Sequence, residues 1–183
     1  MLEELYQETI IELSRSQQYR GDLRDQPHAC DVCMHNPLCG DCVHLWIEPG
    51  ENGVLGKVRF CGHGCSISQA SATMMASLIE GRDAEFAKQL IEDFKLLMAG
   101  KLDESDPARQ RLDTLLALEG VRRFPARQRC AALAFDALTG TLKRLSEHQE
   151  PRMRVTSGCC SIAEAHENDA LVPLGVPLGG KRA

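Results

Sequence analysis

The spacing of hydrophobic positions changes along the chain, and this change predicts where helices and strands lie. Apolar residues recur at helical spacing over residues 2–18, and they do so again over residues 67–81. Between these segments, residues 43–47 and 54–60 alternate apolar and polar side chains on either side of a turn-rich stretch. The pattern predicts a β-hairpin flanked by helices, with a third strand expected near residues 28–34.

The rest of the chain is predicted to be helical, apart from its C-terminal end. One helix is expected to begin after Asp83, a typical N-cap residue, and to end at Gly100. Pro107 opens a shorter helix that reaches Gly120, and a long helix is predicted over residues 126–145.

This order of elements predicts an α+β fold in which a small three-stranded antiparallel sheet packs against several helices. We expect residues 1–150 to form one domain, because a chain of 183 residues is long enough to bury a substantial core. Residues 151–183 are rich in proline and glycine and predict a largely disordered tail.

The net charge and the cysteine content limit the class of partner and the cellular compartment that we expect for this protein. The formal net charge of −5 argues against a nucleic-acid partner, so a protein partner is expected. The chain begins without a basic segment and apolar run, and no stretch approaches the ~18 apolar residues of a membrane span. Nine cysteines, an odd number, argue against a disulfide framework. We therefore expect a cytoplasmic protein, with no membrane association, whose thiols serve metal or redox chemistry.

Three cysteines stand where a predicted element begins or turns. Cys39 lies two residues before Asp41 in a turn ahead of the hairpin, Cys65 comes just before a helix, and Cys130 falls near the start of the last long helix. A helix N-terminus favours a thiolate over a thiol, and the neighbouring Arg127 and Arg129 would add to this effect.

Zinc suits three thiolates and one carboxylate, because it accepts both ligand types and is usually tetrahedral. The carboxylate of Asp41 is the harder ligand of such a set, which suggests a site that can exchange a ligand. Structural zinc is more often held by paired Cys-x-x-Cys knuckles, which these cysteines do not form. A wholly structural zinc remains the alternative.

Three segments carry a resemblance to a known family. They are Asn-Pro-Leu-Cys-Gly-Asp at 36–41, Gly-Cys-Ser-Ile-Ser-Gln-Ala-Ser at 64–71 followed by Met74-Met75, and Arg-Cys-Ala-Ala-Leu at 129–133. In this order they resemble the signatures of the IscU/NifU-like iron–sulfur assembly family, over roughly residues 2–147. The resemblance implies a SufE/NifU-like fold.

Two departures favour the SufU branch of this family over the IscU branch. IscU scaffolds carry a histidine immediately before the third cysteine, where this chain has Arg129, and a Leu-Pro-Pro-Val-Lys motif, which residues 123–127 replace here. The long interval between Cys65 and Cys130 also resembles SufU, whose typical insertion would fall around residues 100–120.

The SufU resemblance implies a zinc-dependent sulfurtransferase, an enzyme that accepts persulfide sulfur from a SufS-type cysteine desulfurase and passes it to downstream iron–sulfur assembly proteins. Zinc would be held by Cys39, Asp41, Cys65 and Cys130. A histidine of the desulfurase would replace Cys39 on the metal, and Cys39 would then act as the catalytic thiol.

Two other functions remain open. The same four ligands could hold an iron–sulfur cluster under assembly, which would make the protein a scaffold. The protein could also be a structural zinc protein that acts only by docking to the desulfurase.

The remaining cysteines give a further candidate site and an unresolved group. His28, Cys30, Cys33 and His35 form His-x-Cys-x-x-Cys-x-His, a compact set for a second metal or a redox pair. Alternation along a strand argues against it, because neighbouring residues point to opposite faces.

Cys42 and Cys61 are interpreted as small strand residues. Arg127 and Arg129 are interpreted either as exposed helix charges or as support for the site. The roles of Cys159 and Cys160 stay open.

Overall fold

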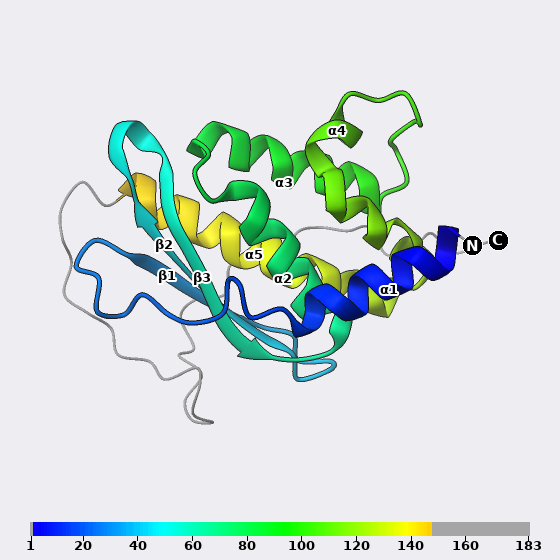
Figure 1. Ribbon diagram of the computed structural model, residues 1–183, viewed down its shortest axis with the longest axis horizontal. Coiled ribbons are helices and arrows are strands. Elements are labelled where there is room, and N and C mark those ends of the chain that lie inside the picture. The colour runs from blue at the N-terminus through cyan, green and yellow to red at the C-terminus, as the bar shows by residue number, and fades with distance from the viewer. Residues whose placement is uncertain (1, 148–183) are drawn as a thin grey trace.

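The computed structural model describes residues 2–147 and has a three-stranded antiparallel sheet with helices packed on it (Figure 1). The predicted α+β fold is confirmed. The elements in chain order are α1 (Leu2–Arg15), β1 (Cys30–His35), β2 (Cys42–Pro49), η1 (Glu51–Gly53), β3 (Leu55–His63), α2 (Ser66–Ile79), α3 (Ala84–Met98), α4 (Ala108–Leu112), η2 (Asp113–Arg123) and α5 (Pro125–Glu147). The predicted tail at 151–183 lies outside the described residues.

The sheet has the order β1-β2-β3, so the hairpin strand β2 lies at its centre. Leu45 of β2 pairs with Val32 of β1 and with Phe60 of β3, and all three side chains are buried. Side chains alternate between the faces of a strand, so residues of this row and of every second row face the core. The opposite face carries the alternate set, in which His35 and Cys42 are paired across β1 and β2.

Helices cover the core face of the sheet. Helix α5 packs along β1 and β2, α2 lies against β3 and α5, and α1 lies against α2 (Figure 1). The rings of Phe94 in α3 and Phe135 in α5 stack with their centroids 3.8 Å apart, which ties the outer helix to the central one. Among residues 2–147, no helix is long and apolar enough to cross a lipid bilayer.

Local sequence signals set most of the boundaries. Asp83 is the N-cap of α3, and its carboxylate accepts a hydrogen bond from the N–H of Phe86 at 2.7 Å. The segment after Pro107, predicted as one short helix, is instead α4 followed by the 3-10 stretch η2. Asp113 has a φ of 43°, a conformation that a continuous α-helix cannot contain.

Candidate metal centre

A tight loop between β1 and β2 presents the first two predicted ligands. The N–H of Asn36 donates to the carbonyl of Asp41 at 2.8 Å, and the N–H of Gly40 donates to the carbonyl of Asn36 at 2.9 Å. Gly40 has a φ of 76°, which glycine adopts without a steric penalty. The loop thus turns back on itself, leaving Cys39 exposed and burying Asp41.

The other two predicted ligands come from helices that meet at this end of the sheet. Cys65 is the N-cap residue of α2, which follows β3 directly, and its N–H donates to Asp41 Oδ1 at 3.2 Å. Cys130 lies in the second turn of α5 and is only 2% exposed. The loop between β1 and β2, the start of α2 and the start of α5 therefore meet at this end of the sheet.

Cys39, Asp41 and Cys130 form a group whose ligand atoms all lie within 4.8 Å of one another. The sulfurs of Cys39 and Cys130 are 3.7 Å apart, close to the ~3.8 Å separation of two sulfurs on one tetrahedral zinc. Cys65 lies beside this group, with its thiol close enough to influence the ionisation of Cys130. The structure thus brings three of the four residues predicted as ligands within 4.8 Å of one another and places Cys65 beside them.

The carboxylate of Asp41 gives an independent sign of a missing partner. Its Oδ2 atom is buried and finds no hydrogen-bond partner among residues 2–147. A buried, unpaired carboxylate oxygen is costly, whereas a metal ion would satisfy it. The donor set and this oxygen both fit a zinc ion.

Burial and polar contacts have opposing effects on the acidity of the site. Burial by itself would raise the pKa of Asp41, but polar contacts with Cys65, Ser68 and Cys39 outweigh it and hold that pKa below its usual value. Asp41 is therefore ionised at neutral pH, as a metal ligand must be.

The pKa of Cys130 moves in the other direction. Burial raises it, and the neighbouring thiols of Cys65 and Cys39 add to the increase. The expectation that a helix N-terminus and two arginines would favour the Cys130 thiolate is not met, because Arg127 and Arg129 are exposed while Cys130 is buried. A metal ion is the group that could hold this thiol deprotonated.

Two residues beside the ligands, Gly64 and Ser68, belong to the motif at 64–71 but were not predicted as site residues. A Cβ on Gly64 would come within 2.7 Å of the Cγ of Asp41 and 2.6 Å of the Oγ of Ser68, so the backbone there must lack a side chain. Ser68 Oγ donates to the carbonyl of Cys65 at 3.0 Å and so closes the first turn of α2. The Gly-Cys motif gave a signal for Gly64, whereas Ser68 reads in sequence only as a helix residue.

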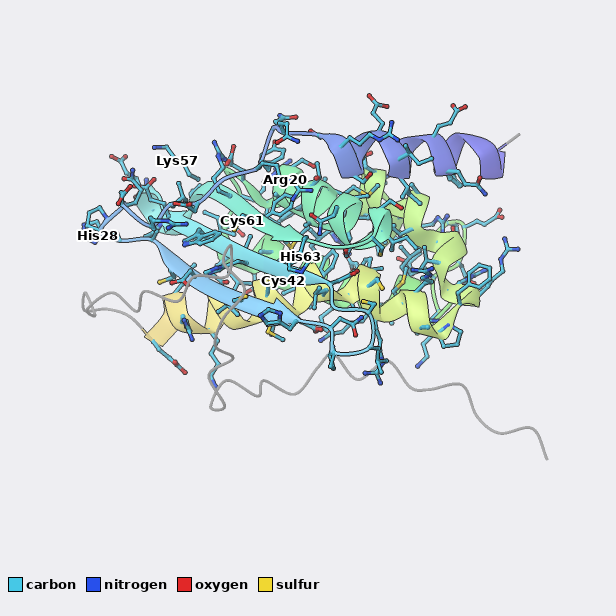
Figure 2. All side chains as sticks on the ribbon, turned by 90° about the horizontal axis from the view of Figure 1, so that it is seen from below. Arg20, His28, Cys42, Lys57, Cys61 and His63 are labelled. Carbon is cyan, nitrogen blue, oxygen red and sulfur yellow. The ribbon has the colours of Figure 1, made fainter. Side chains whose placement is uncertain are left out.

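Strand β1 separates the residues predicted for a second metal or redox site, which are His28, Cys30, Cys33 and His35. Cys33 and His35 lie on the face of β1 away from the core, where Cys42 joins them. Cys30 lies on the other face, paired with the buried Ile47. His28 is exposed and lies before β1, near one end of the molecule (Figure 2).

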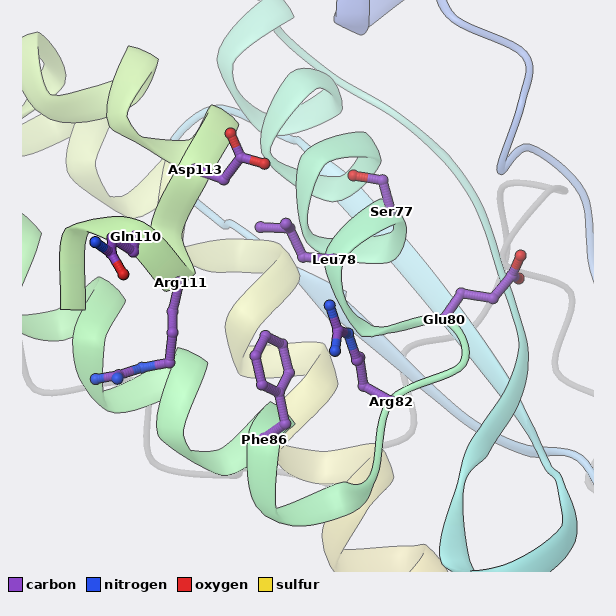
Figure 3. A pocket seen from close by; sticks show the side chains of 8 residues that line it. All are labelled: Ser77, Leu78, Glu80, Arg82, Phe86, Gln110, Arg111 and Asp113. Carbon is purple, nitrogen blue, oxygen red and sulfur yellow. The ribbon is translucent and has the colours of Figure 1, made fainter. Parts of the chain in front are cut away.

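A shallow pocket of about 440 Å³ lies elsewhere, between the end of α2, the start of α3 and α4 (Figure 3). Its lining has both charge signs and contains neither cysteine nor histidine: Ser77, Leu78, Glu80, Arg82, Phe86, Gln110, Arg111 and Asp113. It contributes no ligand to the metal centre.

These features define a class of protein, namely a small α+β domain with a cysteine-rich candidate metal site at one end of its sheet. Residues 5–131 match the NifU-like N-terminal domain family, and the chain belongs to that family. It is an iron–sulfur cluster assembly protein of the IscU/NifU/SufU type.

Known relatives fall in both branches of the family. The zinc-dependent sulfurtransferase SufU of Bacillus subtilis (strain 168) is 38% identical over 137 residues, which cover 75% of this chain and 88% of the relative. The iron–sulfur cluster assembly scaffold protein IscU of Streptococcus pyogenes serotype M1 is 33% identical over 148 residues, covering 81% and 89%. The crystal structure of FiSufU from Fervidobacterium islandicum AW-1 superimposes with a TM-score of 0.64 at 27% identity, covering 74% of this chain and 94% of that one.

Proposed function

We propose that the protein is a zinc-dependent sulfurtransferase that accepts persulfide sulfur from a SufS-type cysteine desulfurase and delivers it to downstream iron–sulfur assembly proteins. The observation that carries this proposal is the exposure of Cys39, since Asp41 and Cys130 in the same group are buried. Leu38 beside it is 72% exposed and offers an apolar contact to a docking protein. The acceptor thiol is thus the ligand that a partner can reach.

Cys39, Asp41, Cys65 and Cys130 would hold the zinc ion. When bound, zinc keeps coordinated thiols deprotonated at neutral pH. Arg127 and Arg129 would add positive charge at the exposed start of α5, near a ligand set that is negative overall, without favouring the thiolate of the buried Cys130. The chemistry requires reduced thiols, which fits the cytoplasmic location expected from the sequence.

Sulfur transfer is a thiol exchange at Cys39. Its thiolate attacks the outer sulfur of the desulfurase persulfide, a new S–S bond forms, and the S–S bond to the desulfurase breaks. The desulfurase cysteine leaves as a thiolate, and Cys39 carries the persulfide. No net oxidation occurs, because one persulfide is exchanged for another.

An iron–sulfur scaffold is the second candidate, and the 33% identity to a protein named as an IscU scaffold favours it. Arg129, in the position where the IscU branch carries a histidine, argues for sulfur transfer instead. The two functions differ in what Cys39 must do, since only an acceptor needs its thiol to turn over sulfur.

The test measures alanine release from L-cysteine by the desulfurase, in the presence of the zinc-loaded protein and a reductant. We expect the wild type to stimulate release and Cys39→Ala to stimulate it at least about tenfold less. Mass spectrometry should find the persulfide on Cys39 of the wild type.

Cys30→Ser is the matched control, because Cys30 is a half-buried cysteine on the core face of β1, outside the ligand group. It should stimulate alanine release as the wild type does. Equal stimulation by Cys39→Ala would overturn the acceptor role. Cluster formation from ferrous iron and sulfide on the same protein would then support the scaffold.

A further inference from the structure

A second cluster of metal-binding side chains lies on the sheet face that the helices do not cover. Cys33 and His35 come from β1, two residues apart and therefore on one face of the strand, and Cys42 of β2 is the direct cross-strand partner of His35. Figure 2 shows Cys42 on this face, with His63 of β3 as its partner on the other side. Strand pairing thus assembles the three side chains without any contribution from the first metal centre.

The distances within this cluster fit one metal ion. Cys33 Sγ lies 3.5 Å from Cys42 Sγ and 3.4 Å from His35 Nε2, and Cys42 Sγ lies 4.0 Å from His35 Nε2. Tetrahedral zinc with ordinary bond lengths separates two sulfurs by about 3.8 Å and a sulfur from a nitrogen by about 3.6 Å. Each observed separation is within about half an ångström of these values.

We propose that Cys33, His35 and Cys42, with Cys33 reduced, form a second zinc site. Two thiolates and one neutral imidazole balance the charge of Zn²⁺, so the filled site is neutral overall. Sulfur and nitrogen donors also favour zinc over magnesium or calcium, which prefer oxygen ligands. Residues 2–147 thus supply three ligands, one fewer than a four-coordinate zinc ion takes. His44, on the same face, is already held by Asp31 at 2.7 Å and takes no part.

The redox state of Cys33 controls this site. Cys33 is disulfide-bonded in the structure, and a disulfide sulfur is not a thiolate ligand. A thiol or phosphine reductant must supply two electrons, and with two protons the disulfide becomes two thiols. Cys42 takes no part in this disulfide, since its sulfur lies 3.5 Å from that of Cys33. Once Cys33 is reduced, the thiols of Cys33 and Cys42 each release a proton as they bind the metal.

The site has a structural consequence for the first metal centre. His35 and Cys42 are the residues on either side of the loop at 36–41, which carries Cys39 and Asp41. A metal bound by both would join the two ends of that loop. We expect hydrogen exchange within residues 36–41 to slow when the second site is filled.

The experiment counts metal on the full chain. The protein is reduced with a phosphine, stripped of metal, loaded with Zn²⁺ without oxygen, freed of unbound metal by gel filtration and analysed by mass spectrometry of the elements. We expect about two zinc ions per chain for the wild type and about one for Cys33→Ser and for His35→Ala. The Co²⁺-loaded wild type should show the absorption bands of tetrahedral cobalt–thiolate coordination. These bands should be weaker in Cys33→Ser and in His35→Ala.

The same sequence motif supplies matched controls. His28→Ala and Cys30→Ser remove the histidine and cysteine that β1 does not place in the cluster, and both should keep two zinc ions. His35→Ala is the safer of the test variants, since His35 is exposed and its loss should not unfold the sheet.

One zinc ion on the wild type, or two on both Cys33→Ser and His35→Ala, would overturn the proposal. The inference is independent of sulfur transfer, because metal is counted without the desulfurase. Alanine release by Cys33→Ser and His35→Ala with the first centre loaded tests the proposed function separately.

Discussion

At the scale of single residues, Gly64 determines how closely Asp41 can approach the start of α2. It has a φ of 157°, and a Cβ there would overlap the carboxylate of Asp41 and the hydroxyl of Ser68. We expect Gly64→Ala to push Asp41 away from the cysteines and lower zinc affinity by about 10- to 100-fold. Competition with a zinc chelator of known affinity measures this change.

Gly53→Ala is the control for backbone strain at this scale. Gly53 also has a positive φ, 78°, but a Cβ there would meet nothing within 4 Å. It should lower stability by about 1 kcal/mol and leave zinc affinity unchanged. Equal zinc affinity in Gly64→Ala and the wild type would show that the close approach does not position Asp41.

At the scale of elements, an ion pair joins α4 to η2. Arg109 donates to Glu119 at 2.9 and 3.4 Å, and both side chains are partly buried. The hydrogen bond from Arg109 holds the pKa of Glu119 below its usual value of 4.5. A lowered pKa stabilises the folded state above the usual pKa, and this contribution is lost as the pH falls through the folded-state value.

We therefore expect Glu119→Gln to lower the free energy of unfolding of metal-free protein by about 1 kcal/mol at pH 7. The difference from the wild type should shrink at a second pH well below 4.5, because the contribution is lost as the pH falls through the lowered pKa of Glu119. Urea unfolding at both pH values measures it, and Arg109→Gln should give the same pH dependence. A difference that stays constant with pH would contradict the assignment.

At the scale of the whole molecule, we expect the fold to persist without metal, because the buried core is large. The core runs from the sheet through α2 and α5 to α3 and η2, and its largest buried side chains include Phe60, Phe94 and Phe135. We expect removal of zinc by a chelator under reducing conditions to lower the melting temperature by about 10 °C, because a bound ligand stabilises by mass action. Circular dichroism should show that the secondary structure remains.

The contrast is with small zinc modules, which unfold when the metal is removed. A metal-free protein that lost its helical signal at room temperature would show that the metal centre, and not the core, holds the fold together. Restoring zinc should return the melting temperature to its starting value.

Periodicity was enough to place most elements, because burial on one face imposes its own spacing on a helix or a strand. The N-cap at Asp83 was predictable for the same local reason. The region after Pro107 was not, because hydrophobic spacing carries no signal for the positive φ of Asp113, which ends α4.

The metal centre was predictable only as a set of residues. The motifs around Cys39, Cys65 and Cys130 name the candidates, but their meeting point, the unpaired Oδ2 of Asp41 and the raised pKa of Cys130 depend on how three elements pack. The second cluster shows more clearly what the sequence alone cannot predict about a site. The sequence groups His28 and Cys30 with Cys33 and His35, whereas cross-strand register selects Cys42 in their place.

The sequence by itself determined the fold class, the order of helices and strands, and the residue types available to a metal. These follow from interactions between residues that are close in the chain. Only the tertiary structure decided which cysteine is exposed and which side chains share a face of the sheet. Those properties depend on strand register and helix packing, which join residues as far apart as Cys39 and Cys130.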